Sequence, residues 1–221
     1  MSHFSYLLLD LDDTLYPNTS GVWAAVRTRI QSFIEQRLAL SPLEASTLRQ
    51  RYLEQFGTTL TGLTHEFGVD VEDYLDYVHD VPLDTFLTAD PHLKAMLQSI
   101  QIPRIIFTNS YRPHADRVLD CLGIGEEIDQ VIDIYALEFQ NKPIKEAYYR
   151  ALELISATDP SQVVFVDDRL ANLEPAAAMK MTTVLVDPDQ GSQTHLHVNQ
   201  ITELTRLLPD LLNGYTGVGN A

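Results

Sequence analysis

YLLLDLDDTLYP, at residues 6–17, joins a short apolar run to a row of acids. Continuous apolar runs of this length are typical of strands that are covered on both faces of a parallel sheet. Removing several neighbouring carboxylates from water is unfavourable, so packing alone does not explain acids at the end of a buried strand. The spacing Asp10-x-Asp12-x-Thr14 lets two carboxylates and a hydroxyl converge on one point. The stretch therefore predicts a site for a cation or for an anionic transition state.

Four further apolar segments are predicted as strands of the same sheet. They span residues 104–110, 130–134, 163–168 and 182–187, the last of which is expected to be the final strand. Helical patterns lie between them; one of these places Ile144, Ala147, Tyr148 and Ala151 on a buried stripe. A last helix with Leu204 and Leu211 is expected to close the domain. The alternation predicts an α/β fold with a doubly wound, Rossmann-like parallel sheet.

Residues 18–90 interrupt this alternation. Their apolar residues recur at helical spacing and no strand pattern is found among them, so an all-helical insert is expected. The insert leaves and returns next to the acidic loop, which favours a cap domain at 18–90 and a core domain at 1–17 and 91–221. The alternative is a helical excursion that covers the sheet without any gating role.

Composition limits the partners. Asp and Glu number 31 against 15 Lys and Arg, and the formal net charge is −16. Such a surface repels nucleic-acid polymers and anionic membranes, whereas a small phosphorylated metabolite needs only a few local cations. The lone cysteine fits a reducing compartment. No run approaches the roughly 18 apolar residues of a membrane span. We expect a cytoplasmic protein that is a monomer or a homodimer.

Polar residues follow the predicted strands at their carboxyl ends, where open α/β sheets bind ligands. Three strand ends and one loop supply them. They are Asp10, Asp12, Thr108, Asn109, Ser110, Lys142, Asp167, Asp168 and Asn172. Carboxylates are the hard oxygen ligands that Mg²⁺ prefers, and a hydroxyl, an amide and an ammonium can hold a phosphate. The set predicts phosphoryl-transfer chemistry.

The motifs that contain these residues resemble those of a known family. DLDDT, the FTN run, Lys142 in NKP and FVDDRLAN match the four motifs of the haloacid dehalogenase superfamily of aspartate-nucleophile phosphatases, in order and spacing. The helical insert resembles the C1-type cap of that superfamily. DLDDTLYP, FTNSY with nearby His114, and the phrase GLTHEFGVDVEDYLDYVHD resemble its pyrimidine 5′-nucleotidase branch.

The resemblance implies a phosphate monoester hydrolase with an aspartyl-phosphate intermediate. It implies that Asp10 is the nucleophile and that Asp12 is the general acid and base. It implies a Mg²⁺ site made by Asp10, Asp168, the main chain of Asp12, and Asp167 either directly or through water. Asp13 is expected to be a bystander.

The same resemblance assigns the phosphate to three further residues. Thr108 and Lys142 would hold the transferring oxygens, and Asn109 would orient the nucleophile or the substrate. The expected substrate is a pyrimidine nucleoside monophosphate; a sugar phosphate, phosphoglycolate or pyridoxal phosphate is the alternative.

Other readings of these residues stay open. A 2-haloacid dehalogenase uses the same nucleophile but needs neither Asp12 nor a metal. A non-enzymatic phospho-acceptor signalling domain also combines acids, a hydroxyl and a lysine, although its acids lie on different strands and it has no cap. His195 and His197 alternate as metal ligands do, yet a surface turn is the expected structure there.

Overall fold

The computed structural model describes residues 4–189 and 191–212, which divide into two compact units. The larger unit comprises Met1–Asn18 and Leu87–Ala221, and the smaller comprises Thr19–Phe86. Sequence analysis placed the insert at 18–90, whereas residues from Leu87 onward belong to the larger unit. The two units are described separately below.

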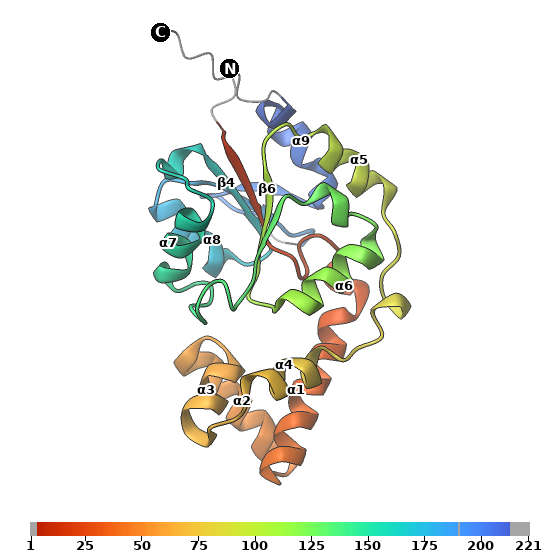
Figure 1. Cartoon of the computed structure of the whole chain (residues 1–221), viewed down its shortest axis with the longest axis vertical. Coiled ribbons are helices and arrows are strands. Elements are labelled where there is room, and N and C mark those ends of the chain that lie inside the picture. Colours follow the sequence, from red (N-terminus) through yellow and green to blue (C-terminus); the bar gives the residue numbers. More distant parts are fainter. Residues whose placement is uncertain (1–3, 190, 213–221) are drawn as a thin grey trace. The chain divides into compact units, whose positions relative to one another are not determined.

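The larger unit is built on a six-stranded parallel sheet (Figure 1). Its strands run in the order β3-β2-β1-β4-β5-β6. Their bounds are β1 Tyr6–Leu9, β2 Arg104–Phe107, β3 Gln130–Ile132, β4 Val163–Asp167, β5 Thr182–Val186 and β6 Leu196–Val198. The chain proceeds outward from β1 in both directions, so the strand order reverses there. This is the point at which doubly wound sheets bind ligands, and the predicted fold class is confirmed.

Helices cover both faces of this sheet, as Figure 1 shows. On one face lie α5 (Pro91–Ser99), α6 (Arg112–Leu122) and α9 (Leu204–Leu207), and on the other lie α7 (Lys145–Leu154) and α8 (Leu170–Ala178). Beneath α7 and α8, the rings of Phe107, Tyr148 and Phe165 form an aromatic cluster with centroids 5.4 to 5.9 Å apart. This buried cluster supports the carboxyl ends of β2 and β4.

Three expectations about local structure were wrong. The sheet does not end at residue 187, because Leu196–Val198 forms β6 and pairs in parallel with β5. His197 therefore lies in this edge strand instead of a surface turn, whereas His195 lies in a bend just before the strand. Ile144 is 38% exposed and precedes α7 instead of belonging to its buried stripe. The closing helix is interrupted, with α9 followed by a 3₁₀ turn at Pro209–Leu212.

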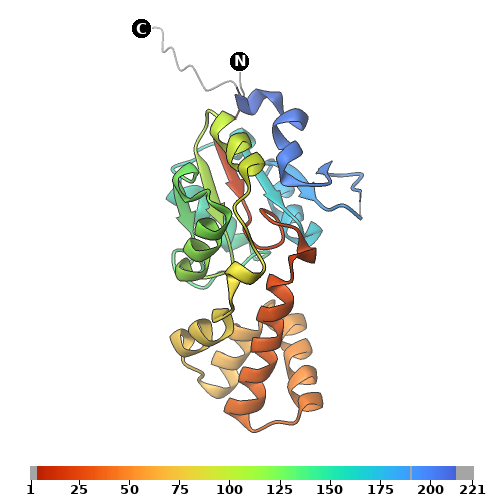
Figure 2. The same ribbon diagram turned by 90° about the vertical axis from the view of Figure 1, so that its right-hand side faces the viewer.

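The smaller unit is entirely helical, and Figure 2 shows its packing. It contains α1 (Val22–Leu38), α2 (Pro42–Phe56), α3 (Thr59–Phe67) and α4 (Val71–His79). Helix α1 packs on α2 and α4, and α2 packs on α3. Ser41 and Glu44 form a reciprocal capping box that fixes where α2 begins. Gly62 lies against the Tyr52 ring, where any side chain would overlap it.

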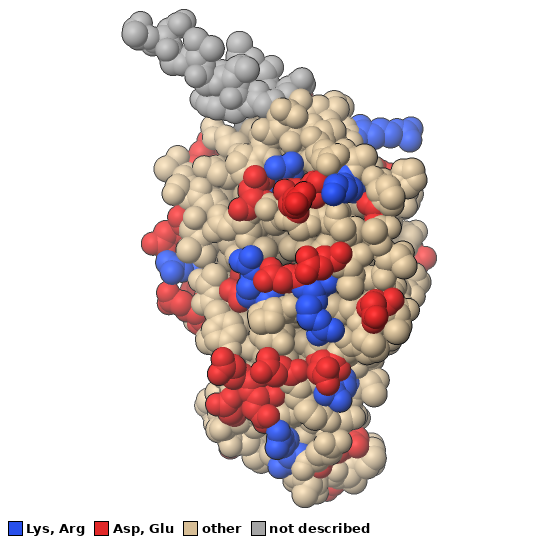
Figure 3. Space-filling view, turned by 45° about the vertical axis from the view of Figure 1, so that its right-hand side comes forward, with Lys and Arg blue, Asp and Glu red and all other residues tan. Residues whose placement is uncertain are grey.

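The surface of both units is rich in acids. On the face seen in Figure 3, acidic side chains gather over the helical unit, and acidic and basic side chains alternate over the sheet unit. Among the described residues, no helix combines the length and the apolarity that crossing a bilayer requires.

Candidate active site

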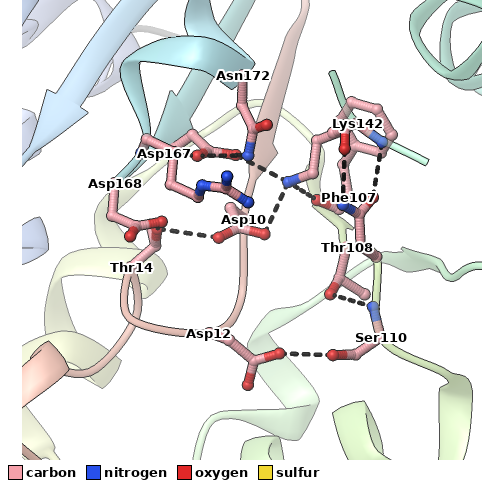
Figure 4. A network of polar contacts seen from close by, with 12 residues as sticks. Asp10, Asp12, Thr14, Phe107, Thr108, Ser110, Lys142, Asp167, Asp168 and Asn172 are labelled. Atoms are coloured by element: carbon pink, nitrogen blue, oxygen red, sulfur yellow. Dashed lines mark hydrogen bonds and ion pairs between the residues drawn. The ribbon is translucent and has the colours of Figure 1, made fainter. Parts of the chain in front are cut away.

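Polar side chains from four parts of the sheet unit meet at the carboxyl ends of β1, β2 and β4 (Figure 4). Asp10 directly follows β1, Asp167 ends β4, and Asp168 comes next. Lys142 enters from the loop between β3 and α7. The strands bring these residues together because parallel neighbours β1, β2 and β4 end at one edge of the sheet.

Lys142 lies at the centre of the cluster and is 1% exposed. Its ammonium donates hydrogen bonds to Asp10 Oδ1 at 2.7 Å, to Asp167 Oδ2 at 2.8 Å and to the Phe107 carbonyl at 2.7 Å. The same nitrogen lies 4.9 Å from the centre of the Phe107 ring and 5.2 Å from that of Phe165. All three donors of the ammonium are thus used, and the aromatic cluster below fixes its position.

The environment shifts the ionisation of these groups. Burial raises the pKa of Asp10 well above its ordinary value, and Lys142 only partly opposes this. Burial and the charges of Asp167 and Asp13 raise the pKa of Asp168 to about 7. Burial lowers the pKa of Lys142, but the two carboxylates outweigh it and raise the net value. The cluster therefore holds more negative charge than its single ammonium can balance, and Asp13 adds to that charge.

This imbalance fits a bound divalent cation. Ligand oxygens of Asp10, Asp167 and Asp168 all lie within 4.8 Å of one another. Three carboxylates against one ammonium leave a formal excess of two negative charges, which is the charge of one Mg²⁺. Hard carboxylate oxygens are the donors this ion prefers.

The three carboxylates differ in how many donors they already accept. Asp167 Oδ1 accepts from the Arg169 N–H at 2.9 Å and from Asn172 Nδ2 at 2.9 Å; its Oδ2 accepts from Asn172 at 3.1 Å and from Lys142. An ionised carboxylate has about four lone-pair sites, so these contacts fill it. Asp10 Oδ2 and Asp168 Oδ1 instead share the Thr14 hydroxyl, at 3.2 and 3.4 Å. Asp10 and Asp168 retain more capacity for a metal than Asp167.

Thr108 and Asn109 follow β2 beside this cluster. The Thr108 hydroxyl accepts the Ser110 N–H at 3.0 Å and is almost fully buried. Asn109 forms a two-way clamp on the main chain of Lys142, accepting its N–H at 2.8 Å and donating to its carbonyl at 2.9 Å. Asn109 therefore orients Lys142, and its expected contact with substrate or nucleophile stays a prediction.

Asp12 has surroundings of its own, made by three residues to which the sequence analysis assigned no contact with it. Tyr16 Oη donates to its Oδ1 at 2.6 Å, and Ser110 Oγ donates to its Oδ2 at 2.6 Å. His114 Nε2 lies 2.8 Å from Oδ1. Burial raises the pKa of Asp12, but His114, Ser110 and Tyr16 outweigh it and lower the net value well below the ordinary range. Asp10 and Asp12 thus have pKa values shifted in opposite directions.

Comparisons with known proteins agree with this architecture. A family model described as a haloacid dehalogenase-like hydrolase matches residues 4–180. The curated Saccharomyces cerevisiae protein named Phosphate metabolism protein 8 is 26% identical over 190 residues, which cover 80% of this chain. The chain spans 59% of the length of that yeast protein.

Solved structures share the fold at low sequence identity. A HAD phosphatase from Thermococcus onnurineus aligns with a TM-score of 0.64 and 17% identity, over 93% of this chain and 98% of its own. The HAD-hydrolase YfnB from Bacillus subtilis, solved with bound magnesium, gives 0.63 and 18% over 93% and 99%. The L-2-haloacid dehalogenase from Xanthobacter autotrophicus, solved with chloropropionic acid covalently bound, gives 0.61 and 16% over 93% and 98%.

Proposed function

Because the chain belongs to the haloacid dehalogenase-like hydrolases, we propose that it is a Mg²⁺-dependent phosphatase of small phosphorylated metabolites. The observation that carries this proposal is the buried cluster of Asp10, Lys142, Asp167 and Asp168. One ammonium among three carboxylates suits a site that takes up both a divalent cation and a phosphate.

In the proposed reaction, Asp10 attacks phosphorus and forms an aspartyl-phosphate while the ester P–O bond breaks. Asp12 gives a proton to the departing oxygen and later takes one from the water that hydrolyses the aspartyl-phosphate. Its three donors favour the ionised form that the second step requires. For the first step, ionised Asp12 takes the proton that a phosphate monoester, with a second pKa of about 6, brings as its monoanion, and passes that proton to the departing oxygen.

Two residues are proposed to receive the phosphate, and a third holds one of them in place. Lys142 supplies the positive charge, and the Thr108 hydroxyl supplies a donor to the transferring oxygens. Asn109 fixes the main chain of Lys142 through its two hydrogen bonds and so holds the ammonium in place.

The side chains of Asp10 and Asp168 and the main-chain carbonyl of Asp12 are proposed to hold Mg²⁺. Asp167, whose oxygens accept from Arg169, Asn172 and Lys142, would act on the metal through water. When bound, Mg²⁺ offsets the repulsion between an anionic nucleophile and an anionic substrate.

The proposed substrate is a pyrimidine nucleoside 5′-monophosphate, and the helical unit Thr19–Phe86 is proposed as a cap of the C1 type. Support comes from the nucleotidase-like phrases in the sequence and from the likeness to a yeast protein named for phosphate metabolism. A sugar phosphate, phosphoglycolate or pyridoxal phosphate is the alternative substrate.

A panel assay tests these proposals. Phosphate release is measured from UMP, CMP, purine nucleotides and the alternative phosphates, with Mg²⁺ and with EDTA, and chloride release is measured from 2-chloropropionate. Asp10→Asn is the test variant, and Asp120→Asn, at an exposed position of α6, is the matched control. We expect Mg²⁺-dependent phosphate release that only Asp10→Asn abolishes. Chloride release without phosphate release would establish the dehalogenase instead.

A further inference from the structure

Three hydrogen-bond donors surround the Asp12 carboxylate, and the binding of metal or phosphate does not explain them. Tyr16 comes from the same loop as Asp12, Ser110 from the loop after β2, and His114 from the first turn of α6. Tyr16 and His114 reach Oδ1, and Ser110 reaches Oδ2. Both oxygens of one carboxylate are therefore held from three directions.

The donors are themselves buried, which makes these contacts important for the site. The exposed fractions are 4% for Tyr16, 5% for Ser110 and 0% for His114. An ionised carboxylate can only accept, so both hydroxyls donate to it and His114 donates through an Nε2–H. A buried donor that loses its partner costs about 1–3 kcal/mol, because water does not replace the partner.

We propose that Tyr16, Ser110 and His114 are positioning residues that hold Asp12 in the rotamer from which it transfers protons. This inference rests on the proposed function, since it assigns the geometry of Asp12 in the same reaction. An aspartate on a loop can turn about two side-chain bonds. Donors on both oxygens restrict that freedom, so the carboxylate faces the departing oxygen and then the water without reorganisation.

The position of Ser110 couples this arrangement to the phosphate. Its hydroxyl holds Asp12 at 2.6 Å while its N–H holds the Thr108 hydroxyl at 3.0 Å. One residue thus sets the distance between the proton-transfer group and a proposed phosphate ligand. Ser110→Ala removes the first contact and leaves the second, because the N–H is part of the main chain.

A purely structural role makes a different prediction. If the donors only compensate a buried charge, their loss lowers stability but leaves the turnover of the folded enzyme unchanged. If they position Asp12, turnover falls while substrate binding stays the same. General acid–base catalysis contributes about 10²–10⁴-fold, and a misplacement of about 1 Å costs up to about 10²-fold. We therefore expect each single loss to lower kcat about 10-fold.

Tyr16→Phe is the main test variant because it removes only a hydroxyl. Its matched control is Tyr52→Phe in the helical unit, where Tyr52 Oη donates to Glu66 Oε2 at 2.8 Å from a fully buried ring. Turnover of p-nitrophenyl phosphate is measured with Mg²⁺ and expressed per folded enzyme. With this substrate only hydrolysis of the aspartyl-phosphate is slowed, so we expect kcat and KM to fall together by about 10-fold and kcat/KM to change less than about twofold. Tyr52→Phe should keep the wild-type kcat.

Conservative replacements at the other two positions add a rescue test. Ser110→Thr and His114→Gln keep a donor, whereas Ser110→Ala and His114→Phe remove it. Ser110→Thr and His114→Gln are expected to keep most of the turnover that Ser110→Ala and His114→Phe lose. Equal turnover in the variants that keep a donor and in those that remove it would overturn the proposal, because the donor would then make no difference to turnover.

Pre-steady-state kinetics measure the individual steps of the folded enzyme, so a loss of stability alone does not change the result. Nitrophenolate leaves without needing a proton, so formation of the aspartyl-phosphate stays fast while its hydrolysis still needs Asp12. The donor-deletion variants are expected to show a burst of nitrophenolate and a phosphorylated Asp10 detectable by mass spectrometry. In an Asp12→Asn background, Tyr16→Phe should add no further loss.

The possible failures are distinguishable. A wild-type protein without Mg²⁺-dependent phosphate release refutes the proposed function. An active wild-type protein whose Tyr16→Phe, Ser110→Ala and His114→Phe variants all keep wild-type turnover refutes this inference alone. Should His114→Phe not fold, the Tyr16 and Ser110 variants decide the outcome.

Discussion

Replacing Lys142 by Met removes the one ammonium of the buried cluster and keeps a side chain of similar length. The change leaves Asp10 and Asp167 without the partner that bonds each at 2.7 and 2.8 Å. Removing one partner of a buried ion pair typically costs about 3–5 kcal/mol, because the remaining charge stays uncompensated. Since Lys142 is 1% exposed, we place the loss within that range at neutral pH.

The loss depends on pH in a defined direction. In the wild-type protein the pKa of Lys142 is raised, so its contribution is complete below the unfolded value of about 10.4 and disappears as pH rises through the folded value. In Lys142→Met, the carboxyl pKa values that burial already raises rise further. The folded variant then binds more protons than its unfolded chain, so its stability falls as pH increases. The gap from wild type should be small at about pH 5 and large at about pH 8.

Urea unfolding followed by circular dichroism measures this gap at both pH values, in EDTA. With a urea dependence of about 1–3 kcal/mol per molar, the midpoint should fall by at least about 1 M at pH 8. The control is Lys145→Met, at the exposed first residue of α7, with no midpoint change expected. Lys142→Met/Asp167→Asn should regain about 1–2 kcal/mol, because one uncompensated charge is gone. A variant as stable as wild type at pH 8 would refute the reasoning.

Three further outcomes are expected. Mg²⁺ at 100 times its dissociation constant should stabilise the protein by about 2.7 kcal/mol, seen as a rise in Tm, and Asp168→Asn should remove most of that rise. Because a pKa of about 7 keeps Asp168 partly protonated at lower pH, Mg²⁺ affinity measured by calorimetry should weaken as pH falls from 8 to 6, and a flat profile would argue against Asp168 as a ligand. Gly62→Ala should destabilise the helical unit by about 1–3 kcal/mol through overlap with Tyr52, while kcat of the folded fraction stays unchanged.

The strands that sequence analysis identified are those whose burial leaves a continuous apolar pattern. β4, for example, is buried at every position from Val163 to Asp167. β6 was not predicted because it is an edge strand of three residues. Leu196 in this strand is 39% exposed and is followed by the polar His197, so no apolar pattern marks it. Its stability comes from parallel pairing with β5, a contact that no local pattern encodes.

The candidate site also has a part that could be predicted from the sequence and a part that could not. Acids, a hydroxyl and a lysine at strand ends were visible in the sequence because such residues are unusual beside apolar runs. The contacts of Ser110 and His114 with Asp12 were not visible, since the two residues lie 98 and 102 positions away and each type is common in loops and helices. A Tyr four residues after Asp12 could have been noticed as a neighbour, but only the loop conformation turns its hydroxyl inward.

Asp10 and Asp12 show why one short loop can carry two different roles. Burial and the neighbouring carboxylates raise the pKa of Asp10, so in the proposed reaction it needs Lys142 and Mg²⁺ to act as an anionic nucleophile. Asp12 lies among the His114 imidazole and the Ser110 and Tyr16 hydroxyls, which together favour its anion. The two side chains are separated by one residue, yet the first is supported by β4 and the loop before α7, and the second by the loop after β2 and by α6. A change in the donors to Asp12 should therefore leave the ion pairs of Asp10 intact, and a change at Lys142 should leave the donors to Asp12 in place.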